Sequence, residues 1–143
     1  MSKLVLFVAG AVVIVVLAAG MFSRNRDQPD NLTLASPSGA QLAADGNTLL
    51  VDIRTPQEWA QTGVVEGALL VTYADADSFL AAVTPHLKEG QTLSLICRSG
   101  NRTSRASRQI AAKTDRQIVD VAGGMQRVVS EGYTPVPAAQ AAR

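Results

Sequence analysis

Residues 92–112 read TLSLICRSGNRTSRASRQIAA, and this stretch is the clearest indication of the fold class. Thr92–Ile96 is a short apolar run typical of a buried strand, and residues 102–112 have the composition of a helix. A small polar turn that contains Gly100 separates them. A strand that passes through a short turn into a helix is typical of an α/β sheet. We therefore expect the turn to lie at the carboxyl edge of a parallel sheet, where such folds bind ligands.

The turn holds Cys97, the only cysteine in the chain. Backbone N–H groups of residues 98–103 and the positive end of the helix dipole would surround the sulfur there and favour the thiolate. Arg98 and Arg102 act in the same direction, because neighbouring cations stabilise a thiolate. The alternative is a buried structural cysteine, since free cysteine is among the most buried residue types. The arginines and Gly100 favour a nucleophile, because an apolar thiol site has no use for cations.

Apolar runs and helical segments alternate along the chain from Asn47 onward. The predicted strands are residues 48–53, 68–71, 92–96 and 117–121. The predicted helices are residues 56–61, 77–87, 102–112 and 125–131, with a short one at residues 38–44. This alternation predicts an α/β fold in which helices flank both faces of a parallel sheet.

The amino-terminal part of the chain is strongly apolar. Residues 4–22 form an uninterrupted run of 19 apolar or glycine residues, which as a helix spans roughly 28 Å and matches a bilayer's hydrocarbon core. We expect one transmembrane helix over residues 1–23, which would make this a single-pass protein of the inner (cytoplasmic) membrane, because Arg24 and Arg26 directly follow the run. A signal peptide that is cleaved after the small residues 18–20, releasing the protein to the periplasm, is the alternative. Lys3 nearly balances the two arginines, so the side of the membrane stays open.

The remaining chain divides into three parts. Residues 24–33 are predicted to be a polar linker, residues 34–136 one folded domain, and residues 137–143 a disordered tail. The formal net charge is only +1, so nucleic acid is not an expected partner. No cluster of His, Cys, Asp and Glu indicates a metal site, and Gly123-Gly124 is more typical of a tight turn than of a nucleotide-binding loop. We expect neither a metal nor a cofactor.

An ordered set of motifs resembles the rhodanese-type, or thiosulfate sulfurtransferase, single-domain family. The motifs are Leu50-Val51-Asp52-Ile53-Arg54, Glu58-Trp59, Gly63, Gly67-Ala68, Cys97-Arg98-Ser99-Gly100-Asn101-Arg102 and Val121-Ala122-Gly123-Gly124-Met125. The resemblance covers residues 34–136 and implies a rhodanese-like domain in which Cys97 carries a sulfane sulfur as a persulfide. The implied partners are a small anionic donor such as thiosulfate and an acceptor that is cyanide, a thiol or a protein. The substrate-binding residues that we expect are Arg98, Ser99, Gly100, Asn101, Arg102 and Thr103.

Several positions refine what the resemblance implies. Asp52 and Arg54 match the family's Asp-x-Arg pair and lie two residues apart on a strand, so we expect a structural clamp rather than chemistry. The family often has His-Ile-Pro where this chain has residues 64–66, Val-Val-Glu, and an aromatic residue after the Gly-Gly turn where it has residues 125–128, Met-Gln-Arg-Val. We expect these departures to change packing or recognition, which leaves the choice of substrate open.

Loop length separates two related chemistries. Cysteine-dependent phosphatases, including those that share this fold, place an arginine after five intervening residues, whereas Arg102 follows Cys97 after four. Thr103 stands at the phosphatase arginine's position, where it would cap the helix or place a hydroxyl near the thiolate. The smaller loop suits a single sulfur atom, so a phosphatase is the less favoured alternative. A membrane-tethered persulfide carrier or partner-binding domain, without thiosulfate turnover, is the other alternative.

Overall fold

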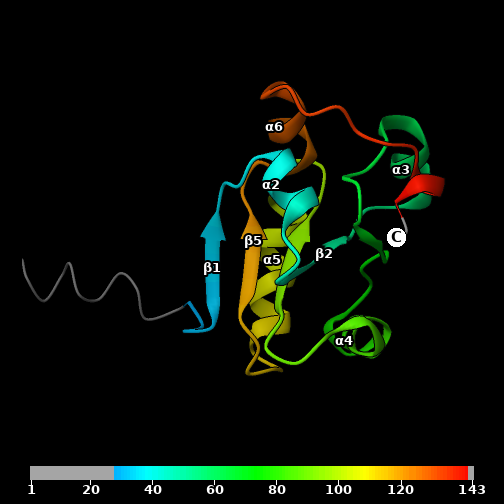
Figure 1. Cartoon of the computed structure of the whole chain (residues 1–143). Helices are drawn as coiled ribbons and strands as arrows, with labels where there is room; N and C mark the ends of the chain where they lie inside the picture. The colour runs from blue at the N-terminus through cyan, green and yellow to red at the C-terminus, as the bar shows by residue number, and fades with distance from the viewer. Residues whose placement is uncertain (1–27, 142–143) are drawn as a thin grey trace, which may run out of the picture.

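The computed structural model describes residues 28–141. The strands are β1 (Leu32–Ala35), β2 (Thr48–Asp52), β3 (Leu69–Leu70), β4 (Thr92–Ile96) and β5 (Ile118–Val121). The helices are α2 (Gly39–Ala44), α3 (Pro56–Thr62), α4 (Ala76–Val83), α5 (Asn101–Ala111) and α6 (Gly124–Ser130), with 3₁₀ turns η2 (Thr84–His86) and η3 (Ala138–Gln140). Every pair of neighbouring strands runs parallel, in the order β1-β5-β4-β2-β3 (Figure 1).

Two apolar cores lie on opposite faces of this sheet. The first joins the sheet to α4 and α5 through, among others, Val51, Leu93, Ile118, Phe79 and Ile110. The second joins the sheet to α2 and α6 through, among others, Leu50, Ile96, Val121, Leu42 and Val128. Successive strand residues alternate between these cores, as the period of a strand requires. The predicted α/β fold, a parallel sheet with helices on both faces, is confirmed.

Strand β1 lies within a stretch that the sequence divides between the polar linker and the domain. Leu32–Ala35 pairs with β5 at one edge of the sheet, so the folded unit begins before residue 34. The Asn31 side chain holds the start of β1 against the domain by donating to the carbonyl oxygens of Ala111, Thr114 and Arg116. The sequence does not reveal this strand because it is short, lies at an edge and exposes 64% of Leu34, so it carries no apolar run.

The carboxyl-terminal segment also differs from the disordered tail that the sequence predicts over residues 137–143. Val136 pairs antiparallel with Val64, and the Gly67 N–H donates to the carbonyl oxygen of Ala141 over 3.0 Å. Ala141 is only 1% exposed, and the segment lies beside α3 (Figure 1). Val64 and Val65, which replace family residues, are fully buried. The part of the tail up to residue 141 is therefore packed on the domain, through backbone bonds that composition does not encode.

The predicted helix over residues 77–87 is divided. α4 ends at Val83 and the 3₁₀ turn η2 follows it, because Pro85 has no N–H with which to continue an α-helix. Residues 28–141 contain no helix that is long and apolar enough to cross a membrane. The run over residues 4–22, for which the sequence predicts a membrane anchor or a signal peptide, lies outside the described residues.

Candidate active site

Cys97 directly follows β4, at the carboxyl edge of the sheet where the sequence predicts it. The residue is only 1% exposed, and its Sγ accepts a hydrogen bond from the Gly100 N–H over 3.1 Å. The Thr103 hydroxyl lies 3.6 Å from the same sulfur. α5 begins beside it at Asn101, so the positive end of the helix dipole lies close to the sulfur. The sulfur is buried, as in the structural alternative, but its contacts within the loop are polar.

Gly100 gives the loop its shape. Its φ of +92° lies in the left-handed region, which side chains rarely adopt, and it is the N-cap of α5. Its carbonyl oxygen accepts hydrogen bonds from the Ser104 N–H over 2.9 Å and from the Thr103 hydroxyl over 3.0 Å. Gly100 therefore directs its N–H to the sulfur and its carbonyl group to the first turn of α5. The Thr103 hydroxyl lies near the sulfur, as one of its two predicted roles requires. The other role, a cap of the helix, is wrong, because α5 begins two residues earlier with Gly100 as its N-cap and no side chain caps it.

The Gly123-Gly124 turn packs directly against the cysteine loop. The N–H groups of Met125 and Gln126 donate to the carbonyl oxygens of Cys97 and Arg98, over 2.8 and 2.9 Å. Gly124 has a φ of +55°, and a Cβ atom there would collide with the Cys97 carbonyl oxygen. The first turn of α6 thus holds the backbone of the loop. The sequence predicts a tight turn here but not its contact with Cys97.

The Arg102 side chain bonds an acid on a neighbouring helix, which the sequence does not predict. Its guanidinium donates to both carboxylate oxygens of Glu58 on α3, with a distance of 2.8 Å from Nη1 to Oε2. This hydrogen bond, more than any other contact, lowers the pKa of Glu58 from 4.5 to about 2, and it raises the pKa of Arg102. Most of the Arg102 charge is therefore compensated, and direct binding of substrate by this residue stays a prediction.

Arg98 differs from Arg102 in this respect. Its side chain is exposed and forms no hydrogen bond or ion pair within residues 28–141. It opens onto a hollow of ≈ 640 Å³ between α3 and α6. The other lining residues are Arg54, Glu58, Gln61, Thr62, Met125, Gln126, Val129, Ser130 and Pro135. The hollow thus combines an apolar wall from α6 with one uncompensated positive charge beside the cysteine loop.

Ser99 and Asn101, two further predicted binding residues, are exposed on the surface of the loop.

Asp52 and Arg54 form the clamp that the sequence predicts. Both side chains are buried, with a distance of 2.7 Å between Nη2 of Arg54 and Oδ2 of Asp52. Arg54 also donates to the Gly63 carbonyl oxygen and the Thr62 hydroxyl, over 2.7 and 2.6 Å. The Trp59 indole N–H donates to Asp52 over 3.1 Å. The pair therefore ties β2 to the middle and the carboxyl end of α3, and its charges are compensated within the fold.

A buried acid near the cysteine, Asp120, is not among the site residues that the sequence predicts. Asp120 points from β5 toward α5 and is 6% exposed, and its Oδ1 atom has no hydrogen-bond partner among the described residues. Burial raises the pKa of this carboxyl group above its ordinary value. The Ser107 hydroxyl, on the same side of α5, is also buried without a partner there. In the sequence, Asp120 is indicated by its position as a single acid within the apolar strand Ile118–Val121.

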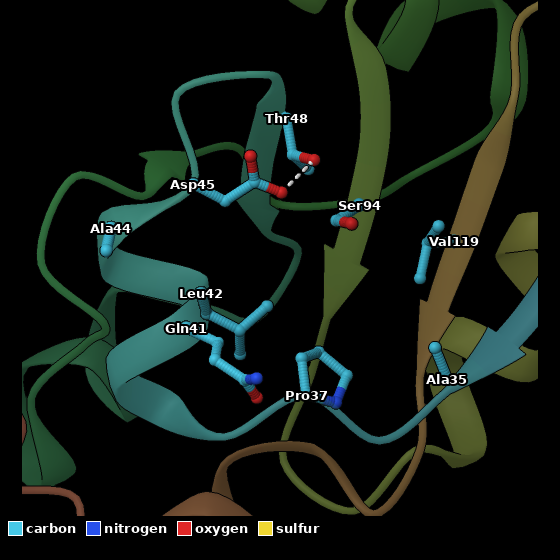
Figure 2. A pocket seen from close by; sticks show the side chains of 9 residues that line it. All are labelled: Ala35, Pro37, Gln41, Leu42, Ala44, Asp45, Thr48, Ser94 and Val119. Carbon is cyan, nitrogen blue, oxygen red and sulfur yellow. Dashed lines mark hydrogen bonds between the residues drawn. The ribbon is translucent and has the colours of Figure 1, made fainter.

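A second hollow, of ≈ 590 Å³, lies between α2 and the sheet (Figure 2). Figure 2 shows Leu42 and Pro37 on one side and Val119 and Ser94 on the other. Neither Cys97 nor any residue of its loop lines it. Within residues 28–141 no group of three or more His, Cys, Asp or Glu residues is arranged to hold a metal ion.

The fold and the loop define a parallel α/β domain with one cysteine at the carboxyl edge of its sheet. The family model described as "Rhodanese-like domain" matches residues 38–131. The chain therefore belongs to the rhodanese-like domain family. A comparison with curated proteins gives no match.

Solved structures share the fold. A rhodanese-related protein from Thermoplasma volcanium is 26% identical, with a TM-score of 0.52 over 68% of this chain and 93% of that one. The polysulfide-sulfur transferase homodimer of Wolinella succinogenes is 19% identical, with a TM-score of 0.59 over 83% and 88%. A Rhodopseudomonas palustris protein described as a possible tyrosine phosphatase is 20% identical, with a TM-score of 0.58 over 72% and 84%. The last two likenesses show the fold alone.

Proposed function

We propose that this protein is a sulfurtransferase in which Cys97 carries a sulfane sulfur as a persulfide. The observation that carries the proposal is the setting of Cys97, whose sulfur accepts the Gly100 N–H at the start of α5 in a loop with four residues before Arg102. Membership of the rhodanese-like family supports sulfur transfer in general. The choice of thiosulfate as the donor rests only on the resemblance of the loop to the rhodanese-type family.

The reaction proceeds in two displacement steps. The Cys97 thiolate attacks the outer sulfur of thiosulfate, a new S–S bond forms, and sulfite leaves with the electrons of the broken bond. A thiolate or cyanide acceptor then attacks the outer sulfur of the persulfide and releases the Cys97 thiolate. Since the chain has only one cysteine, no resolving thiol exists within it and the acceptor is a separate molecule.

The unpaired charge of Arg98 is the group that we assign to the anionic donor. Its guanidinium has no competing acid within residues 28–141, whereas Arg102 is held by Glu58 and Arg54 by Asp52. The helix dipole of α5 and the Gly100 N–H add to its attraction for an anion close to the sulfur. The hollow between α3 and α6 gives an acceptor thiol, free or on a partner protein, a route to the loop.

We also propose that residues 4–22 tether the protein to the inner (cytoplasmic) membrane, which rests on the length of the apolar run and on the arginines after it. Extraction of membranes with alkaline carbonate checks this proposal. A tethered protein stays with the lipid fraction, whereas release together with loss of the first residues indicates a cleaved signal peptide.

Thiocyanate formation from thiosulfate and cyanide tests the proposed activity. The full chain in detergent is expected to form thiocyanate, and Cys97→Ser is expected to form none. Activity with polysulfide but not with thiosulfate would mean that polysulfide is the donor, and the persulfide mechanism would stand. Hydrolysis of an aryl phosphate without sulfur transfer would support a phosphatase, and inactivity with every donor would favour a partner-binding domain.

A further inference from the structure

We propose that the hollow between α2 and the sheet binds a small organic cation with an apolar body, at a site separate from Cys97. The hollow measures ≈ 590 Å³, within the range of about 300–1,000 Å³ that is typical of small-molecule sites. No residue of the cysteine loop lines it. The inference therefore goes beyond sulfur transfer and does not depend on it.

The small side chain of Ser94 leaves this hollow open. On β4, Leu93 and Leu95 belong to the core beneath α5, so Ser94 faces the opposite side of the sheet, toward α2. In the register of the parallel strands, Ser94 lies between Leu50 of β2 and Val119 of β5. A serine is much smaller than these two apolar neighbours, so it leaves space on the sheet that a residue of their size would fill.

The Ser94 hydroxyl is a buried polar group without a partner. The residue is only 4% exposed, and its hydroxyl forms no hydrogen bond within residues 28–141. The side chain points into the hollow (Figure 2). A hydroxyl has one donor and two acceptor sites, and a buried polar group that stays unpaired costs free energy. A ligand that donates a hydrogen bond to Ser94 therefore binds better than one that leaves the hydroxyl unpaired.

A carboxylate lies at the same end of the hollow as this hydroxyl. The Thr48 hydroxyl donates to Asp45 over 2.6 Å. Thr48 pairs with Thr92, two residues before Ser94, so Thr48 and Ser94 are diagonal neighbours on one face of the sheet. Asp45 also accepts the Asn47 N–H, but a carboxylate has about four acceptor sites, so sites remain for a ligand.

The charge of this end selects the sign of the ligand. Asp45 is exposed, and none of the residues that line the hollow is basic. An ammonium group between Asp45 and Ser94 thus meets one opposite charge and one free acceptor, whereas a carboxylate there would be repelled. The geometry therefore favours a cation over an anion or a neutral molecule of the same size.

The rest of the lining is mostly apolar and suits a ring or a short alkyl chain. Its apolar residues are Ala35, Pro37, Leu42, Ala44 and Val119. Figure 2 shows Leu42 and Pro37 on one side of the space and Val119 on the other. Gln41 is the polar exception, and its side-chain carbonyl oxygen accepts the Ser38 N–H. A ligand with its ammonium group at Asp45 thus covers its apolar body with aliphatic side chains.

Three probes of similar size that differ in charge test the inference: benzylammonium, benzyl alcohol and benzoate. The backbone amide NMR signals of Thr48, Ser94 and Val119 are followed as each probe is added to the full chain in nanodiscs of neutral lipid. Signals of the protein exclude probe that is merely dissolved in lipid. Benzylammonium is expected to shift these signals saturably and to bind about fivefold more tightly than benzyl alcohol, the upper range for an exposed ion pair. Benzoate is expected to bind most weakly.

Four variants assign the binding to this hollow. Ser94→Leu fills the space and is expected to abolish the shifts with every probe. Ser94→Ala keeps the space but removes the hydroxyl, so benzylammonium should bind severalfold more weakly. Asp45→Asn should remove the preference for benzylammonium over benzyl alcohol. Asp115→Asn is the matched control, because it removes an acid that does not line the hollow, and it should leave all three affinities unchanged.

Several results would overturn the inference. They are the absence of saturable shifts with benzylammonium, equal affinities for the three probes, and shifts that persist in Ser94→Leu. Shifts of the same signals that depend on protein concentration, without any probe, would mean that a second copy of the chain covers the hollow and would also overturn it. If Ser94→Leu does not fold, Ser94→Ala and Asp45→Asn still decide, because unchanged benzylammonium binding in both would exclude the site.

Discussion

The Arg102 guanidinium bonds both oxygens of Glu58, across the space between α5 and α3. This contact separates the roles of the two arginines in the cysteine loop. Arg102 ties the start of α5 to the first turn of α3, whereas Arg98 is exposed and has no acid partner among the described residues. Of these two arginines, Arg98 is therefore the one whose positive charge is uncompensated and can attract a small anion.

Replacing Arg98 should weaken donor binding more than replacing Arg102. Arg98→Ala is expected to raise KM for thiosulfate roughly tenfold, about 1.4 kcal/mol, because an unpaired cation is lost. Arg102→Ala, the matched control, is expected to cost mainly stability. Steady-state kinetics at low and high salt check this, and the Arg98 effect should shrink as salt screens the charge. Equal effects of the two variants on KM would contradict the assignment.

The Glu58 and Arg102 pair should make stability depend on acid pH. The pKa of Glu58 is lowered from 4.5 to about 2 in the folded state. Its contribution is therefore complete above about pH 4.5 and is lost as the pH falls toward 2. Because Arg102 is 44% exposed, we expect no more than about 1 kcal/mol. Urea unfolding of Glu58→Gln and wild type should differ at pH 6 and converge below pH 3. A difference that grows on acidification would contradict this sign.

Gly124→Ala should disturb the cysteine loop as well as the turn. A Cβ atom there collides with the Cys97 carbonyl oxygen and lies 2.8 Å from that of Arg98. We expect a loss of stability of about 2 kcal/mol or more and a large loss of sulfur transfer. Gly132→Ala is the matched control, because Gly132 also has a positive φ, +99°, but nothing lies within 4 Å of its Cβ position. Denaturant unfolding and activity of both variants check this, and equal activity in the two would contradict a role for Gly124 in holding the loop.

Asp52→Asn should destabilise the domain strongly without removing a reacting group. The variant leaves the buried Arg54 guanidinium without its counter-charge, which typically costs about 3–5 kcal/mol. Arg54→Met with Asp52→Leu, which removes both charges, is expected to recover part of that loss. Chemical unfolding measures the free energies. A double variant less stable than Asp52→Asn would contradict a cost that arises from the unpaired charge.

The sequence predicts the central strands, α5 and the position of Cys97, because apolar runs, helix composition and a single thiol are local signals. It does not reveal β1, whose Leu34 faces solvent at an edge, or the contact of Ala141 with Gly67, which is a backbone bond between distant residues. It also does not reveal that Glu58 compensates Arg102, since 44 residues separate them. It also does not reveal that Asp120 of β5 is buried and shares a small hollow with Ser107 and Arg108 of α5, since these residues lie on different elements.

Intact-mass spectrometry of the full chain, before and after thiosulfate, detects the Cys97 persulfide itself. We expect a gain of one sulfur atom, roughly 32 Da, that a thiol acceptor removes and that Cys97→Ser does not acquire. The same experiment with polysulfide identifies a different donor. A folded protein that gains no sulfur from either donor, while Cys97 still reacts with a small alkylating reagent, would contradict the persulfide mechanism.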